Sequence, residues 1–347
     1  MGRAATRIAV TLGTAAALLA ATMALNHAVD PLWYSGGNKL GGRNFVFNER
    51  HSKINLLWPE RHAYDCFIFG SSRATLLHQS DLKRHRCFNL AFSAATPPEV
   101  LAYGRYLVRH GIRPRRVIVA VDMRNFSRRR LAREIPDFVA RGAPPPSALS
   151  GLVSLDAALF SIRTLLGHSP YARYYDHRFD VQVLPRARAM TIPACFSDVD
   201  RGRPFTTAHL HYYAALRAVF PGSEFVGYTA PISAWDMTVL RADGSLESYL
   251  DTQVAVARVF DRYYDFAVPS AITADPRNSY DGDHFMPRVN RLIAATLDSD
   301  VPRFGLALHH LSPGAYRRAF RRALDAFSRR TGPIPLRRDC GRRPAVR

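Results

Sequence analysis

A serine early in the chain and an acidic residue with a histidine late in it have the residue types of a catalytic triad. Ser72 lies in the turn Gly70–Ser72, directly after an apolar run, and Asp281 stands three residues before His284. A serine hydroxyl attacks acyl carbons when a histidine removes its proton and a carboxylate orients that histidine. The expected roles are therefore nucleophile for Ser72, general base for His284 and orienting acid for Asp281.

The sequence around Ser72 predicts a parallel α/β sheet that would place these groups at one edge. Strands that alternate with helices form parallel sheets, and ligands bind beyond the carboxyl ends of the strands. The turn at Ser72 would occupy such an end. The expected strands are Cys66–Phe69, Cys87–Ala91 and Val117–Val121, and the helices between them are Arg73–Arg84, with an interruption, and Pro98–His110.

The alternation of strands and helices stops between residues 126 and about 205, and this stretch is interpreted as a mainly helical insertion. Before the sheet, residues 29–60 are interpreted as a connector. The predicted domains are a segment 1–28, the connector 29–60, an α/β domain 61–300 and a basic C-terminal segment 301–347. The further elements expected are helices at Glu49–Leu57, Ser154–Leu166, Leu246–Tyr263 and Arg288–Leu297, and strands at Glu224–Tyr228 and Tyr264–Ala267.

The N-terminal segment has the composition of a membrane anchor. Arg3 and Arg7 precede Ile8–Leu25, a run of 18 uncharged, mostly apolar residues. This length is at the lower limit for a spanning helix, and the flanking arginines favour an N-terminus on the inside. A cleaved signal peptide is the alternative, with a passable cleavage site at Thr22–Ala24. The uncleaved anchor is favoured, and with either reading the rest of the chain is exported.

The chain is strongly basic, with 48 Lys and Arg against 28 Asp and Glu. Because the chain is expected to be exported, this charge would face anionic lipid headgroups or an acidic polymer, and nucleic acid is not an expected partner. Near the C-terminus, arginines surround an apolar stripe of helical spacing. Such a helix could lie on a membrane surface, but packing against its own domain is favoured. The stripe is Tyr316, Phe320, Leu324 and Phe327.

Cysteines and histidines were considered for covalent and metal chemistry. Cys66 and Cys87 each begin an expected strand, so that adjacent parallel strands would bring their sulfur atoms together in a disulfide. Two small buried hydrophobic residues are the equal alternative. No disulfide is assigned to the two remaining cysteines. No metal site is predicted, although histidines are paired at His209–His211 and His309-His310.

Three segments together resemble the SGNH (GDSL-like) hydrolase superfamily. Gly70–Ser72 corresponds to its first block, which gives Ser72 the nucleophile's position. Asn89–Thr96 is similar to the second block and has Ala94 where an oxyanion-hole glycine is expected. Asp281–His284 matches the final Asp-x-x-His block, whose spacing favours Asp281 over Asp283 as the acid. The third block, Gly-x-Asn-Asp, is not clearly present, and Asn125 is its candidate substitute.

The resemblance implies a three-layer, flavodoxin-like parallel sheet flanked by helices. It also implies an oxyanion hole formed by the N–H groups of Ser72 and Ala94 with Asn125, and a mechanism that needs no cofactor. Arg73 and Asn89 lie beside the implied site and are expected to bind substrate, although a surface ion pair is the alternative for Arg73.

The overall layout is similar to the membrane-anchored SGNH-like proteins of bacterial envelopes, some of which carry Val-Asp-Pro after the anchor, as at Val29–Pro31. The resemblance is to proteins of alginate O-acetylation and teichoic-acid D-alanylation. It implies acyl transfer or ester hydrolysis on an envelope glycan, with a membrane-bound O-acyltransferase as partner. The implied location is the bacterial inner membrane, crossed once, with the domain in the periplasm. The alternatives are a non-catalytic assembly subunit and an esterase or lipase for small substrates.

Overall fold

The chain divides into two compact units, each described here by itself. The computed structural model describes residues 2–45, 48–127, 130–169, 171–185, 187–192, 196–197, 204–332 and 336–337. One unit comprises Met1–Glu60 and Ala143–Leu184, and the other comprises Arg61–Gly142 and Pro185–Arg347. The expected connector and the middle of the expected insertion therefore belong to a single unit, and the C-terminal segment belongs to the unit that contains the large sheet.

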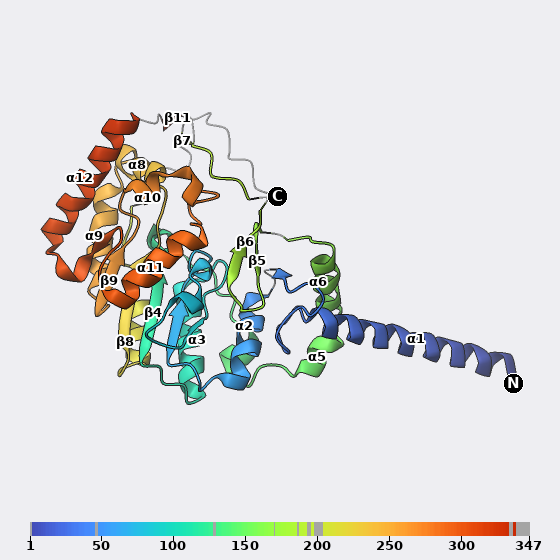
Figure 1. Cartoon of the computed structure of the whole chain (residues 1–347). Coiled ribbons are helices and arrows are strands. Elements are labelled where there is room, and N and C mark those ends of the chain that lie inside the picture. The colour runs from blue at the N-terminus through green and yellow to red at the C-terminus, as the bar shows by residue number, and fades with distance from the viewer. Residues whose placement is uncertain are drawn as a thin grey trace. The chain divides into compact units, whose positions relative to one another are not determined.

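The second unit is built on a six-stranded, mostly parallel sheet, which confirms the predicted α/β class (Figure 1). The strand order is β10-β9-β8-β4-β2-β3, and only β10 runs antiparallel to its neighbour. Numbered along the chain, the five parallel strands stand in the order 2-1-3-4-5. The strands are β2 (Cys66–Phe69), β3 (Cys87–Asn89), β4 (Arg116–Val121), β8 (Glu224–Thr229), β9 (Arg262–Asp265) and β10 (Leu306–Ala307).

Helices cover both faces of this sheet. α3 begins with prolines behind a capping box, in which the Glu99 carboxylate accepts hydrogen bonds from the N–H and hydroxyl of Thr96. The helices of this unit are α3 (Pro97–Arg109), α4 (Asp137–Arg141), α7 (Leu210–Val219), α8 (Ala234–Ala242), α9 (Leu246–Ala257), α10 (Ala271–Ala274), α11 (Pro287–Ser299) and α12 (Pro313–Thr331). A further short pair, β7 (Phe196–Ser197) and β11 (Leu336–Arg337), is parallel.

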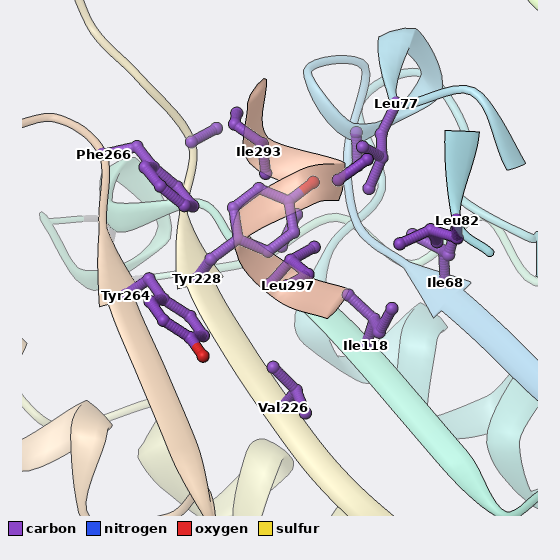
Figure 2. Packing of buried hydrophobic residues seen from close by; sticks show 14 of the residues in the cluster. Ile68, Leu77, Leu82, Ile118, Val226, Tyr228, Tyr264, Phe266, Ile293 and Leu297 are labelled. Carbon is purple, nitrogen blue, oxygen red and sulfur yellow. The ribbon is translucent and has the colours of Figure 1, made fainter. Parts of the chain in front are cut away.

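One face of the sheet packs against α11. Alternate strand residues such as Ile68, Ile118 and Val226 point to this face, and Ile293 and Leu297 of α11 meet them there (Figure 2). Because side chains alternate along a strand and repeat every three to four residues along a helix, these spacings produce one continuous apolar layer.

The opposite face packs against α3 and α7. The ring of Phe69 lies 6.3 Å from that of Phe220, which follows α7. Gly104 of α3 permits close approach, because a Cβ there would lie 2.5 Å from Leu216 of α7. Helix α7 was not predicted from the sequence, although its buried residues Tyr213 and Leu216 have helical spacing.

The interruption predicted within Arg73–Arg84 is present, but the helical pieces on either side of it are 3₁₀ turns and not α-helix. Two 3₁₀ turns, Ala74–Leu76 and Gln79–Asp81, occupy this crossover. The reason lies in the Asn89 side chain, whose amide donates to the carbonyls of Ala74 and Leu77, both at 2.8 Å. Carbonyls held in this way do not continue an α-helical ladder.

The expected insertion has more helix than strand among its described residues, but it also contains strands that were not predicted. Between α6 and the end of the first unit, β5 and β6 form an antiparallel hairpin that extends to β1. Asp176 closes the hairpin turn by accepting from the N–H groups of Arg178 and Asp180. The elements of this unit are α1 (Gly2–Val29), β1 (Asn44–Phe45), α2 (Glu49–Leu57), α5 (Ala148–Leu152), α6 (Leu155–Leu165), β5 (Arg173–Tyr175) and β6 (Val181–Val183).

Of the two alternatives for the paired cysteines, the structure has the disulfide. Cys66 and Cys87 are register partners on β2 and β3, their Cα atoms are 4.2 Å apart, and their sulfur atoms are bonded. A crosslink closing a loop of this size stabilises a fold by about 3 kcal/mol on the chain-entropy view. Cys195 and Cys340 lie outside the described residues.

The C-terminal helix packs on its own unit, as favoured. Its apolar stripe is buried, with Phe320 against Tyr249 of α9 and Phe327 against Trp235 of α8.

Among the described residues, α1 is the one helix long and apolar enough to cross a membrane. Its most apolar window has a mean hydropathy of 2.0, and none of that window is buried. A membrane span and a signal sequence share these properties.

Candidate active site

The turn after β2 holds Ser72 at the carboxyl edge of the sheet. Gly70 has a φ of +154°, and a Cβ on it would lie 2.8 Å from the Cβ atoms of both Ala74 and Ala120. Only glycine therefore allows the chain to turn so closely between the 3₁₀ segment and β4. This close turn brings the half-buried Ser72 to the end of its strand.

The structure brings the three expected triad residues together. The Oγ of Ser72 lies 2.7 Å from Nε2 of His284, and Nδ1 of His284 lies 2.6 Å from Oδ2 of Asp281. A carboxylate at Nδ1 favours the tautomer with the proton on that nitrogen. Nε2 is then free of a proton and can accept the one on the Ser72 hydroxyl.

The loop that carries the histidine is braced by its own hydrogen bonds. Oδ1 of Asp281 accepts from the N–H groups of Asp283 and His284, at 2.9 and 2.8 Å. The buried Ser279 hydroxyl donates to the His284 carbonyl and accepts from the Gly282 N–H. These contacts fix the orientation of the imidazole before any substrate binds.

Asp281 is held as a carboxylate. Burial by itself raises the pKa of this carboxyl group. The hydrogen bond to His284, the attraction of that ring and the two backbone N–H donors outweigh burial and lower the pKa to about 2. At neutral pH the group is therefore charged and can stabilise an imidazolium beside it.

Asp283, the rival acid, is engaged elsewhere. Its carboxylate pairs with Arg73 at 3.1 Å and with Arg124. Arg73 also lies 3.5 Å from Asp122, and its side chain is only 6% exposed. Burial lowers the pKa of this guanidinium, but the carboxylates of Asp122 and Asp283 more than offset that and raise it.

Arg73 therefore joins three segments of the site, namely the turn after β2, the end of β4 and the histidine loop. Arg73 is thus held in an ion pair with two carboxylates, which was the alternative to substrate binding, and its expected substrate-binding role stays a prediction. Arg124 is the arginine of this cluster that solvent reaches, with a side chain 54% exposed. Asp122 and Arg124 had no predicted role, although both follow the carboxyl end of β4.

Asn89 also has a structural place. Its amide nitrogen donates to the Ala74 and Leu77 carbonyls, and its Oδ1 accepts from the Ala91 N–H at 3.0 Å. These bonds shape the 3₁₀ crossover. The substrate-binding role expected for Asn89 stays a prediction beside this structural one.

Ala94 lies in the left-handed region of the backbone, with a φ of +56°. Its turn follows β3, and the Phe92 N–H donates to the Gly70 carbonyl at 3.2 Å, so that the two turns are neighbours. A left-handed conformation costs a residue with a Cβ about 1–2 kcal/mol. Residue 94, where the resemblance leads us to expect glycine, thus has a backbone conformation that glycine adopts without strain and alanine does not.

Asn125 lies on the 3₁₀ turn Met123–Ser127, directly after Arg124. Its side chain is buried and hydrogen-bonds the hydroxyl of Tyr213 on α7. Its N–H donates to the Asp122 carbonyl at 3.0 Å.

Away from the triad, His309 and His310 have an acidic partner that the sequence analysis did not find. Asp300 lies 3.0 Å from Nε2 of His309 and 3.4 Å from Nε2 of His310. Arg262 and the Tyr264 hydroxyl contact the same carboxylate. The positive charge of the Arg262 guanidinium would repel a metal ion bound at these side chains. The cluster therefore has the character of a hydrogen-bonded network.

Comparisons of the chain with protein-family models, with curated proteins and with solved structures find no match.

Proposed function

We propose that this chain is an exported, serine-dependent acyl-ester hydrolase or O-acyltransferase of the SGNH type. The observation that carries the proposal is the continuous hydrogen-bonded path from Ser72 through His284 to Asp281. Its contacts have lengths suited to proton transfer, and its order is that of nucleophile, base and orienting acid.

The arrangement of the sheet supports the proposal. The strand order 2-1-3-4-5 is that of flavodoxin-like folds, in which ligands bind where the order reverses. Here the reversal lies between β2 and β4. Ser72 follows β2, and the Arg73 partner Asp122 follows β4.

The chemistry follows from these positions. His284 removes the hydroxyl proton of Ser72 as the Oγ of Ser72 bonds to an ester carbonyl carbon. Asp281 stabilises the imidazolium that results. The N–H groups of Ser72 and Ala94 stabilise the oxyanion, with Asn125 as a further donor. His284 then protonates the alcohol oxygen as its bond to the acyl carbon breaks. The acyl group remains bonded to Ser72. Water or a sugar hydroxyl, deprotonated by His284, releases the acyl group.

The proposed substrate is an acyl ester of an envelope glycan, with a membrane-bound O-acyltransferase as partner. An apolar N-terminal helix and a net charge of +20 support a location at a membrane beside acidic polymer. The proposed orientation places the second unit on the periplasmic side of a bacterial inner membrane.

The experiment is a burst assay with p-nitrophenyl acetate. The full chain is expected to release p-nitrophenol in a burst equal to the enzyme concentration, and Ser72→Ala is expected to abolish it. Ser71→Ala is the matched control, since Ser71 contacts Asp122 at 3.4 Å and has no role in the triad. A folded wild-type chain without a burst would support a non-catalytic assembly subunit. Transfer of the acetyl group to an oligosaccharide, in excess over transfer to water, distinguishes a transferase from a small-substrate esterase.

A further inference from the structure

The helices α5 and α6, with the residues that end them, expose large apolar side chains, and on α6 the spacing of Leu155, Leu159 and Ile162 places them on one side of the helix. We call these side chains together the α5–α6 apolar face. Contiguous apolar surface is rare on water-soluble proteins and marks a site of interaction. With their exposed fractions, its residues are Leu149 (60%), Val153 (42%), Leu155 (79%), Leu159 (45%), Ile162 (46%), Leu165 (51%) and Leu166 (67%).

The covered side of α6 is composed of small and polar residues. Ala157, Ser161 and Thr164 are buried, with exposed fractions of 1%, 0% and 7%. A surface helix of a water-soluble domain has the opposite arrangement, with large apolar residues inward and polar residues outward. Small residues inward and large apolar residues outward are typical of helices that pack together in lipid.

The partner on the covered side is the end of α1. The amide of Asn26 donates to the carbonyls of Gly151, Leu152 and Ser154, at 3.3, 2.9 and 3.0 Å. The Ser161 hydroxyl donates to Oδ1 of Asn26 at 3.1 Å. Asn26 is 3% exposed, so its polar groups are satisfied inside the unit. Figure 1 shows α5 and α6 on either side of this end of α1.

The length of α1 determines the depth of the α5–α6 apolar face relative to the bilayer. At about 1.5 Å per residue, the 28 residues of α1 extend about 42 Å, beyond a hydrocarbon core of about 30 Å. The final turns, which include Asn26, then reach the headgroup region. Lys39 lies there too, because its ammonium group is 3.1 Å from the His27 carbonyl. A cation at a helix C-terminus is suited to that region.

We propose that the α5–α6 apolar face lies in the lipid at the boundary of the bilayer and fixes the first unit against it. Lipid is the occupant because the face adjoins the end of α1, whose own apolar surface is exposed along its candidate span. Helices α5 and α6 would then lie in the membrane interface, beside α1 as the transmembrane helix. This inference is independent of the triad chemistry.

The first experiment measures the depth of the α5–α6 apolar face with brominated lipids. The full chain is reconstituted in phosphatidylglycerol nanodiscs with acyl-brominated phosphatidylcholine, and tryptophan is introduced as Leu159→Trp or Leu166→Trp. Both variants are expected to lose more emission than the wild type, with its three tryptophans. Arg178→Trp, in the exposed hairpin turn, gives the value for a solvated site. Quenching no greater than at residue 178 would overturn the proposal.

The second experiment separates lipid from a protein partner. A benzophenone amino acid at position 159 is photolysed in native membranes containing the full chain. Adducts with the mass of a phospholipid support the proposal. A protein adduct of defined mass, without lipid adducts, would overturn it and assign the face to a membrane-protein partner. Unchanged melting temperatures of the variants show that the fold is retained.

Discussion

Ser72 Oγ and His284 Nε2 lie 2.7 Å apart although 212 residues separate them in the chain. Ser72 lies in the turn after β2, the first parallel strand of the sheet, and His284 is carried by the loop that precedes α11. The parallel topology brings both to the carboxyl edge, where strand ends meet. A hydroxyl and an imidazole in this geometry, with a carboxylate behind the ring, can generate a serine nucleophile.

Asp281→Asn is expected to reduce the rate of acyl-Ser72 formation about 10⁴-fold while the fold is kept. An asparagine amide at Nδ1 favours the tautomer that carries its proton on Nε2, which then cannot accept from Ser72. The measurement is the p-nitrophenol burst rate. Asp283→Asn is the matched control, since Asp283 pairs with Arg73 and Arg124. Equal losses in the two variants would contradict the assignment of the acid.

The pKa of Asp281 also predicts an acid-dependent loss of stability. Because its pKa is lowered to about 2 in the folded state, the unfolded chain binds the proton more tightly. The stabilisation is complete above about pH 4 and is lost as the pH falls toward about 2. The measurement is urea unfolding of the wild type and of Asp281→Asn at pH values between about 4 and about 2. The difference in free energy of unfolding between the two should narrow toward low pH, and a constant difference would refute the linkage.

Arg73→Met is expected to lower the free energy of unfolding by about 3 kcal/mol, because it leaves the partly buried carboxylates of Asp122 and Asp283 without this partner. If Arg73 positions the histidine loop, the folded fraction should show a reduced kcat with KM nearly unchanged. Arg73→Lys should recover part of the stability. A raised KM with an unchanged kcat would instead support the substrate-binding role and contradict the positioning role.

Ala94→Gly is expected to stabilise the protein by about 0.5–1 kcal/mol. Relief of the left-handed strain is about 1–2 kcal/mol, and the greater freedom of glycine in the unfolded chain offsets part of it. The backbone N–H is kept, so the burst rate should not fall. Urea unfolding provides the measurement, with Ala94→Val as the contrasting variant that should destabilise. A higher free energy of unfolding in Ala94→Val would contradict the presence of backbone strain at residue 94.

The five parallel strands and the candidate triad residues were predictable from the sequence because each carries a local signal, although the helix expected at Leu246–Tyr263 ends at Ala257 and β9 begins at Arg262. Apolar runs that end in a glycine turn define a strand edge, and Asp281 and His284 are three residues apart. The contact between Arg73 and Asp283 has no such signal, because an ion pair between distant segments leaves no periodic pattern. The 3₁₀ crossover after Ser72 was missed because its carbonyls are held by a side chain from the following strand, Asn89.

The first unit shows the same limit. Strands β5 and β6 are only three residues long, which is too short for alternation to be recognised. For α6, the spacing in Ser154–Leu166 predicts the helix but not which side is covered. That depends on Asn26, more than a hundred residues earlier in the chain.

The most direct test of Ser72 as the nucleophile is covalent trapping with a fluorophosphonate, followed by mass spectrometry of the labelled peptide. We expect a single adduct on Ser72, formed much more slowly in His284→Ala and retained in Ser71→Ala. Label on another residue, or none on a chain that circular dichroism shows to be folded, would contradict it.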